Sequence, residues 1–343
     1  MGAGGGGRAG GTRPPAVAAA VSVRLDSPDA IERQLAELRG AAAGTEAGVR
    51  THIVDLLAYA DEAAVADELA TAIAGLRHSR PSRALVACGD AQAEVVTAAP
   101  SVYCAPMQEG GKAIVCSELV RLDGPATGDA LASMAASLLL PDLPVFLLWT
   151  APPDFERPVF KALRTLATRL VTDSTRFPET LDALGAVVAQ DREVVTDLAW
   201  TKITGWREVV ASIFDDPDHR DALGRLEHVA IDYVRGSDAQ ARLLGGWLVA
   251  GSGCDAVVTT RPVERPDMRV GSLAHVAIDA GGRHYTVDRP QEGMAVIDAP
   301  GRATRRVALR VPPFEVLIGE ELEFLTNDHA FLAALGAAAE GGG

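Results

Sequence analysis

Hydrophobic and polar positions alternate in two different ways along the chain, and the pattern changes near residue 196. Before it, short apolar runs typical of buried strands alternate with stretches in which apolar residues recur every three or four positions. This order predicts a mostly parallel α/β sheet domain over residues 26–175, followed by a linking helix over residues 176–195. Beyond the linking helix, strand patterns outnumber helical ones. They predict an α+β domain with an antiparallel sheet over residues 196–338.

One strand of the first region is predicted to be buried on both faces. Val145–Trp149 is apolar at every position, which is typical of a central parallel strand covered by helices on each side. Two prolines precede this run and two follow it, and they hold the chain extended at both ends. Residues 84–88 and 169–171 predict further strands, the second of them the last in its sheet. Residues 114–122 are more polar and predict a strand near an edge.

Helices and turns of the second region have equally local signals. Ile203, Trp206, Val210 and Ile213 recur at helical spacing and predict a strong amphipathic helix. Six apolar segments after residue 228 predict strands, and Gly281-Gly282 between two of them is a two-residue hairpin signal. A last helix is predicted near the carboxyl end of the domain.

The amino-terminal residues 1–25 differ from both regions. They are rich in Gly, Ala and Pro, and such a segment buries too little apolar surface to offset the entropy of ordering it. We therefore expect a disordered tail. From Ser27 onward, Ile31, Leu35 and Leu38 recur at helical spacing, which predicts a short amphipathic helix leading into the first domain.

Composition and charge narrow the class of protein. The chain has 343 residues, of which 48% are hydrophobic and 23% charged, a balance typical of a globular protein with two domains. Acidic residues outnumber basic ones by 46 to 32, a net charge of −14 spread along the chain, which argues against nucleic acid as a partner. The longest apolar runs are far shorter than the roughly 20 residues of a membrane span, so no membrane partner is expected.

The four cysteines form neither a CxxC pair nor a zinc-like spacing. Cys88 and Cys116 could face each other on neighbouring strands, although buried, reduced thiols are the more ordinary interpretation. A reduced, cytoplasmic location is the expectation that follows.

Motifs that carry chemistry are missing where the fold would place them. The first strand-to-helix turn, Tyr59–Glu62, lacks glycines, and its acidic start would repel phosphate. Gly110-Gly111-Lys112 resembles the end of a P-loop, but Ala113 stands where Ser or Thr would bind Mg²⁺. Gly251-Ser252-Gly253 lacks the spacing of a nucleophile elbow, and the seven histidines are scattered. We therefore predict no catalytic residue, no cofactor site and no metal site.

Two segments that contain tryptophan are the strongest candidates for a functional surface. Trp149 ends the buried strand at the carboxyl edge, where α/β sheets present their sites. In Thr196–Arg207, Trp206 fits the apolar face of the helix and is predicted to be core. Trp200 precedes that helix, and it either packs between the domains or contacts a partner.

Four segments together resemble one family, the glucose-6-phosphate dehydrogenase assembly proteins, OpcA. They are DSPDAIERQLAELR at Asp26–Arg39, HSRPSRALV at His78–Val86, LLLPDLPVFLLW at Leu138–Trp149 and TDLAWTKITGWR at Thr196–Arg207. Asp288-Arg289-Pro290-Gln291 also suits the family. The resemblance runs over residues 26–324. It departs from the family pattern at Trp149, where two adjacent tryptophans are common, and over residues 251–267.

The resemblance implies a non-catalytic factor that binds glucose-6-phosphate dehydrogenase, stabilises its active oligomer and so serves the oxidative pentose phosphate pathway. It supplies no catalytic residues. The candidate contact residues are Asp142, Pro144, Trp149, Asp197, Trp200, Arg207 and Arg289. The alternative is an enzyme or ligand sensor that binds a sugar phosphate or nucleotide at the carboxyl edge of the first sheet. A bound anion there would favour the alternative, and an apolar patch around Trp149 or Trp200 would favour the assembly factor.

Overall fold

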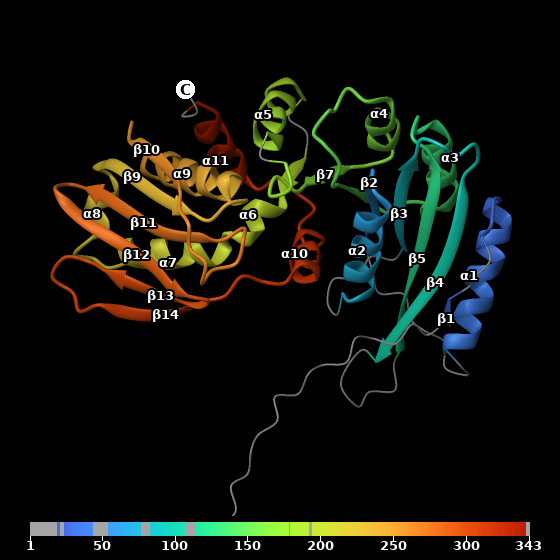
Figure 1. Cartoon of the computed structure of the whole chain (residues 1–343), viewed down its shortest axis with the longest axis horizontal. Coiled ribbons are helices and arrows are strands. Elements are labelled where there is room, and N and C mark those ends of the chain that lie inside the picture. Colours follow the sequence, from blue (N-terminus) through green and yellow to red (C-terminus); the bar gives the residue numbers. More distant parts are fainter. Residues whose placement is uncertain are drawn as a thin grey trace, which may run out of the picture.

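The computed structural model of the chain describes residues 19–20, 24–43, 54–76, 83–106, 114–177, 179–191 and 194–340. Most of the predicted disordered tail, and the Gly110-Gly111-Lys112 motif, lie outside these residues. The described part contains two sheets that follow each other along the long axis of the molecule (Figure 1). This arrangement confirms the predicted fold class, a mostly parallel α/β sheet followed by a mostly antiparallel one.

The first sheet has the strand order β1-β4-β5-β3-β2-β6-β7-β8. From β5 to β8 all neighbours are parallel, and β4 and β1 are antiparallel additions at one edge. The strands are β1 (Ala19–Ala20), β2 (Asp55–Ala60), β3 (Arg83–Asp90), β4 (Thr97–Pro106), β5 (Ile114–Pro125), β6 (Val145–Trp149), β7 (Arg169–Thr172) and β8 (Val195–Asp197). As predicted, β6 is central and parallel to both neighbours, and all five of its residues are buried.

Helices cover both faces of the first sheet. One face packs against α1 (Pro28–Ala43), α3 (Asp129–Leu138) and α4 (Pro158–Arg164), with α5 (Thr180–Asp191) continuing the same core. The other face packs against α2 (Ala63–Ala74) and α10 (Phe314–Glu321). The predicted first helix is α1, and the hydroxyl of Ser27 accepts a hydrogen bond from the Ala30 amide at its start, 3.3 Å.

The second sheet has the order β10-β9-β11-β12-β13-β14, antiparallel except for the pair β9 and β10. Its strands are β9 (Leu226–Tyr233), β10 (Val257–Pro262), β11 (Leu273–Ala280), β12 (Arg283–Gln291), β13 (Gly293–Asp298) and β14 (Arg305–Leu309). The hairpin predicted at Gly281-Gly282 joins β11 to β12, and both glycines have positive φ, 59° and 70°.

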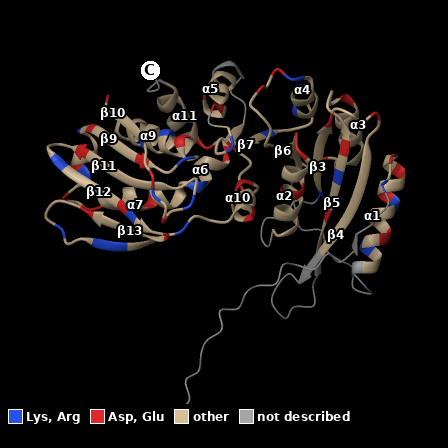
Figure 2. Ribbon diagram, viewed as in Figure 1, with Lys and Arg blue, Asp and Glu red and all other residues tan. Residues whose placement is uncertain are grey.

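Helices cover one face of the second sheet. They are α6 (Leu198–Lys202), α7 (Thr204–Phe214), α8 (Arg220–Leu223), α9 (Asp238–Ser252) and α11 (His329–Glu340). Gly246 lets α9 and α11 approach closely, because an added Cβ there would lie 2.2 Å from the Ala334 carbonyl oxygen. Side chains on the other face of β9, β11 and β12 are half-buried or exposed, and charged residues of both signs are interspersed on this sheet (Figure 2).

Residues 114–122 belong to β5, which is third in the strand order from one edge of the first sheet, in agreement with the predicted place near an edge. One strand prediction was wrong, because long-range pairing decides where an edge lies. The 169–171 strand is not the last, because β8 pairs beyond it.

The chain crosses between the two sheets more than once. β8 completes the first sheet, and α6 leads from it into the second part of the molecule. After β14, α10 returns to the first sheet, where Leu317 and Ile318 pack beside Phe146 and Leu148. The predicted domain limits stay a prediction, and these crossings hold the two sheets together.

The expectation that Cys88 and Cys116 are both reduced thiols is wrong for Cys116. Cys88 is a free, buried thiol, and Asp123 rather than Cys116 lies opposite it in the register of β3 and β5. Cys116 is disulfide-bonded, not a reduced thiol, and the residue opposite it in the antiparallel register of β4 is Cys104. Within the described residues, no helix is long and apolar enough to cross a membrane.

Candidate functional site

The carboxyl edge of the first sheet is filled by side chains at the point where nucleotides bind in many α/β proteins. Tyr59 ends β2 and stacks on Trp149 at the end of β6, with ring centroids 4.5 Å apart and planes within 9°. Phe160 meets the same indole edge-on at 5.0 Å, and the Trp149 Nε1 donates to the Pro152 carbonyl, 3.0 Å. Trp149 was a candidate contact residue, but its side chain is only 1% exposed.

An ion pair also helps to fill the carboxyl edge of the first sheet. The two terminal nitrogens of Arg157 donate to the two carboxylate oxygens of Asp61 at 2.7 and 2.8 Å, and the guanidinium lies 5.8 Å from the Trp149 ring centroid. Hydrogen bonds from Arg157 and Tyr59 outweigh partial burial and lower the pKa of Asp61. The acidic turn seen in the sequence therefore binds an arginine of its own chain.

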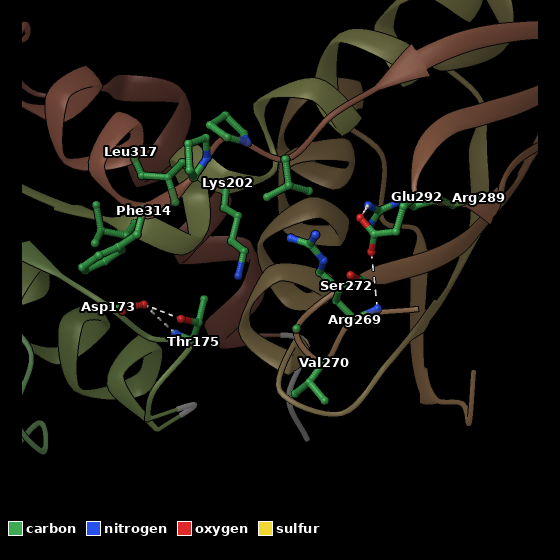
Figure 3. Close-up of a pocket in the computed structure, with 15 residues that line it drawn as sticks. Asp173, Thr175, Lys202, Arg269, Val270, Ser272, Arg289, Glu292, Phe314 and Leu317 are labelled. Atoms are coloured by element: carbon green, nitrogen blue, oxygen red, sulfur yellow. Dashed lines mark hydrogen bonds and ion pairs between the residues drawn. The ribbon is translucent and has the colours of Figure 1, made fainter. Parts of the chain in front are cut away.

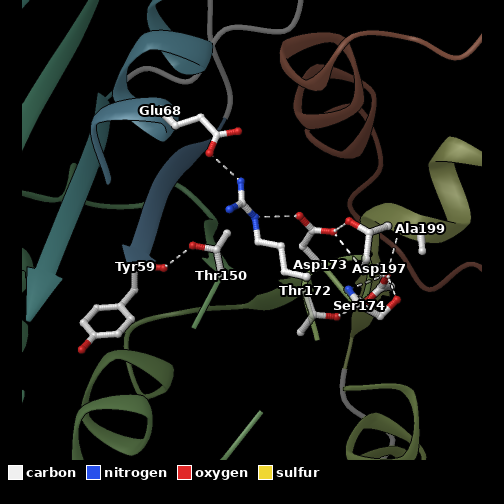
Figure 4. Close-up of polar contacts among 10 residues, drawn as sticks. Tyr59, Glu68, Thr150, Thr172, Asp173, Ser174, Asp197 and Ala199 are labelled. Carbon is white, nitrogen blue, oxygen red and sulfur yellow. Dashed lines mark hydrogen bonds and ion pairs between the residues drawn. The ribbon is translucent and has the colours of Figure 1, made fainter. Parts of the chain in front are cut away.

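Asp197 is a buried structural carboxylate. Its oxygens accept hydrogen bonds from the hydroxyls of Thr172 and Ser174, at 2.5 and 2.7 Å, and from the Ala199 amide at the start of α6, 2.8 Å (Figure 4). Burial raises the pKa of Asp197 to about 6, although these hydrogen bonds oppose the shift. The side chain joins β7, β8 and α6, so it is not the surface neighbour of a contact that we expected.

Trp200 and Arg207 lie together, as their place in one segment suggested. The Arg207 guanidinium stacks over the Trp200 ring at 3.6 Å, and the indole Nε1 donates to Asp328, 2.7 Å. Trp200 is 2% exposed and also contacts Phe331 of α11, so of its two predicted roles the structure shows packing. Trp206 is core, as predicted.

A cavity of about 630 Å³ lies above Trp200 and Arg207. Its rim is the loop between α10 and α11, on which Phe324 is 62% exposed and Leu325 47% exposed. We call this region the acidic loop surface; it comprises Glu320, Glu323, Phe324 and Asp328, which line the cavity with Trp200 and Arg207, and the exposed Leu325 next to Phe324 in the chain. Arg169 also lines the cavity, and its guanidinium already donates hydrogen bonds to Glu321 and to the Phe324 and Thr326 carbonyls.

A second cavity, the inter-sheet pocket, has a volume of about 290 Å³ and lies where the two halves of the molecule meet (Figure 3). The loop after β7, α6, the segment before β11, the end of β12 and the start of α10 all line it. Its charged residues are Asp173, Lys202, Arg269, Arg289 and Glu292. Lys202 points between Asp173 on one wall and Arg269 on the other.

The predicted contact residues thus separate into groups. Asp142 and Pro144 lie at the amino end of β6, opposite Trp149, and Asp142 is exposed with a positive φ of 67°. Trp200 and Arg207 share the acidic loop surface, whereas Arg289 lies in the wall of the inter-sheet pocket. Their role as contact residues stays a prediction.

Sequence reasoning missed Lys202 and Phe324. The sequence offered one indication that Lys202 is unusual, because the chain contains only three lysines. Phe324 had none, since a single aromatic residue near a helix end is ordinary. Within the described residues, no group of three or more His, Cys, Asp or Glu side chains could hold a metal ion.

The fold and these surfaces define a two-sheet protein in which side chains fill the carboxyl edge of the first sheet and two cavities, the one above Trp200 and the inter-sheet pocket, lie where its halves meet. Two family models match it. Residues 73–189 match the glucose-6-phosphate dehydrogenase subunit N-terminal domain, and residues 193–335 match the corresponding C-terminal domain. The chain belongs to the OpcA family.

Individual relatives are consistent with this family. Proteins named provisionally as OxPP cycle protein OpcA are 33% identical in Synechocystis sp. over 50% of this chain and in Nostoc punctiforme over 46%. The matches span only 37% and 34% of those proteins, so the chain covers about a third of their length. A solved structure named provisionally as an oxidoreductase, from Erwinia carotovora atroseptica, aligns with a TM-score of 0.48 at 8% identity, covering 84% of this chain and 97% of that one.

Proposed function

We propose that the chain is a non-catalytic assembly factor that binds glucose-6-phosphate dehydrogenase and stabilises its active oligomer, in the oxidative pentose phosphate pathway. The observation that carries the proposal is the family match, which extends over both halves of the chain. The filled carboxyl edge of the first sheet supports the proposal, because Tyr59, Trp149 and Arg157 occupy the place where dinucleotide-binding α/β proteins hold their ligand. The cytoplasmic location expected from the sequence belongs to the same proposal.

The acidic loop surface is the part of the chain that we propose for the contact. Phe324 and Leu325 expose apolar area beside Trp200 and Arg207, and exposed aromatic side chains are common anchors of protein interfaces. Glu320 and Glu323 lie beside them in a chain of net charge −14, which favours a partner surface with basic residues. Burial, together with repulsion from Glu323 and Glu208, raises the pKa of Glu320, so a basic partner would relieve this crowding.

A factor of this kind acts through differential affinity. If it binds the active oligomer more tightly than the inactive forms, each tenfold difference shifts the equilibrium by about 1.4 kcal/mol. No group of the factor needs to touch the reacting atoms of the dehydrogenase.

Co-purification with the cognate dehydrogenase, mass measurement of the complex and an activity assay test the proposal. We expect a complex of defined mass, activation of the dehydrogenase, and no sugar-phosphate oxidation by the factor alone. Phe324→Ala should weaken binding about thirtyfold if Phe324 anchors the contact, which corresponds to ~2 kcal/mol. Val257→Ala, at a residue that is 61% exposed on the second sheet, is the matched control and should bind normally.

Two results would count against these statements. Failure of the wild-type proteins to form a complex would refute the assembly role. A normal affinity of Phe324→Ala would leave the assembly role standing and move the contact to another surface.

A further inference from the structure

The inter-sheet pocket is locally cationic in a chain whose net charge is −14. Three basic side chains line it, Lys202, Arg269 and Arg289, against two carboxylates. Both carboxylates already have partners in the wall. Asp173 accepts hydrogen bonds from Thr175 and pairs with Arg176 at 3.2 Å. Glu292 accepts from Arg289 at 3.0 Å and from the Arg269 amide at 3.3 Å.

The basic groups, by contrast, have unused donors. Arg289 is 1% exposed, yet its Nε and one terminal nitrogen have no acceptor among the described residues. In the same part of the chain, no hydrogen bond or ion pair involves the Lys202 ammonium or the Arg269 guanidinium. Burial lowers the pKa of Lys202, opposed by the charge of Asp173 and supported by that of Arg289. Lys202 is half-buried and Arg269 is exposed, so the buried donors without acceptors are those of Arg289. Such donors are costly to leave unpaired, and together with the two neighbouring cations they favour an anion in the pocket.

Size and lining restrict what the anion can be. The volume of about 290 Å³ is at the lower end of ligand pockets, which suits a small metabolite and is too small for a dinucleotide. Phe314 and Leu317 lie on the side of the pocket opposite Arg269 and Arg289 (Figure 3), and Leu198 adds apolar lining. The amino end of α10, with Pro313 as its cap, also borders the cavity, and a helix amino end favours negative charge.

We propose that the inter-sheet pocket binds a small phosphate monoester. Lys202 and Arg269 contact the phosphate group, Arg289 adds positive potential from behind Glu292, and Phe314 and Leu317 meet the carbon part of the ligand. This inference goes beyond the assembly role, since it concerns binding by the chain alone. Because the pocket is lined from both halves, an occupied pocket would also bind them to each other.

Titration calorimetry on the chain without the dehydrogenase tests the proposal, in low-salt buffer that contains no phosphate. The probes are glucose 6-phosphate, inorganic phosphate and glucose. Lys202→Met and Arg269→Gln remove one charge each. Lys161→Met is the matched control, because that lysine is 58% exposed on α4. Thermal melts of each variant show whether it folds.

We expect glucose 6-phosphate to bind more tightly than inorganic phosphate, and glucose not to bind. Lys202→Met should weaken binding about tenfold or more, as expected for loss of a charged hydrogen bond, while Lys161→Met should leave it unchanged. Binding that survives both pocket variants, or no binding of either anion at ~10 mM, would overturn the site. Equal affinity for the two anions would overturn the ester and leave only a free-phosphate site. None of these outcomes bears on formation of the dehydrogenase complex.

Discussion

The two sheets of this protein differ in how many of their faces are covered by helices. The first is covered by helices on both sides, and its central strand β6 carries no polar residue. The second is covered on one side, and its strands alternate buried and accessible residues, as in Tyr285, Thr286 and Val287 of β12. Parallel sheets need cover on both faces, whereas antiparallel sheets tolerate water on one.

The charged side chains of the two sheets differ in burial as well. The first sheet contains charged side chains that are both buried and paired. Arg83, 1% exposed, bonds to Glu118 and Glu32 and to the Leu138 carbonyl. On the open face of the second sheet, His284 and His275 contact Asp279 and Asp288 at 2.7 Å in water-exposed pairs. Polar contacts should therefore matter much more to stability in the first sheet than in the second.

The largest expected effect is that of Trp149→Ala. It removes the stack on Tyr59 and the edge contact with Phe160, and leaves a cavity in the covered sheet, so unfolding free energy should fall by about 3–5 kcal/mol. Val257→Ala on the second sheet should change it by less than ~0.5 kcal/mol. Chemical denaturation of both variants measures the difference. Equal losses would mean that the two sheets do not differ in this way.

What the sequence could predict depended on how local the cause is. The uninterrupted apolar run identified β6, and the Gly281-Gly282 pair identified a hairpin, because both signals lie within the element itself. β4 was missed, since Pro100 interrupts a segment of small residues that is a strand only because β5 pairs with it. Asp197 before Leu198 was a helix-capping signal, and it could have been recognised as one.

The candidate site was harder to predict, because its cause is long-range. Trp200 is buried by Asp328 and Phe331, more than 120 residues later in the chain, and no local pattern contains that information. The inter-sheet pocket brings Lys202 together with Arg269 and Arg289 from separate segments. Burial of Arg289 at the end of a strand is likewise invisible in the sequence.

The substitution Asp197→Asn should have an intermediate effect on the unfolding free energy, and this effect should depend on pH. The folded pKa of Asp197 is raised from 3.8 to about 6, so its stabilising share is complete below pH 3.8 and is lost as pH rises to 6. The unfolding free energy of the wild type, minus that of the variant, should therefore fall by up to about 3 kcal/mol between pH 4 and 6. Denaturation curves at several pH values check the sign, and a difference that rises with pH would contradict the burial argument.

The smallest effect, and one of opposite sign, is expected at Asp279 on the open face. Its pKa is lowered mainly by the hydrogen bond from His284, with His228 adding to it, so its contribution is present above the ordinary aspartate pKa and is lost as pH falls. Because the side chain is 45% exposed and screened by water, the wild-type advantage over Asp279→Asn should stay below ~1 kcal/mol. It should also shrink in 1 M salt, where the Debye length is about 3 Å, whereas the Asp197 effect, shielded from solvent, should persist. The same denaturation series, repeated at low and high salt, measures both. A salt-insensitive effect of several kcal/mol at Asp279 would contradict the exposed, water-screened pairing on this face.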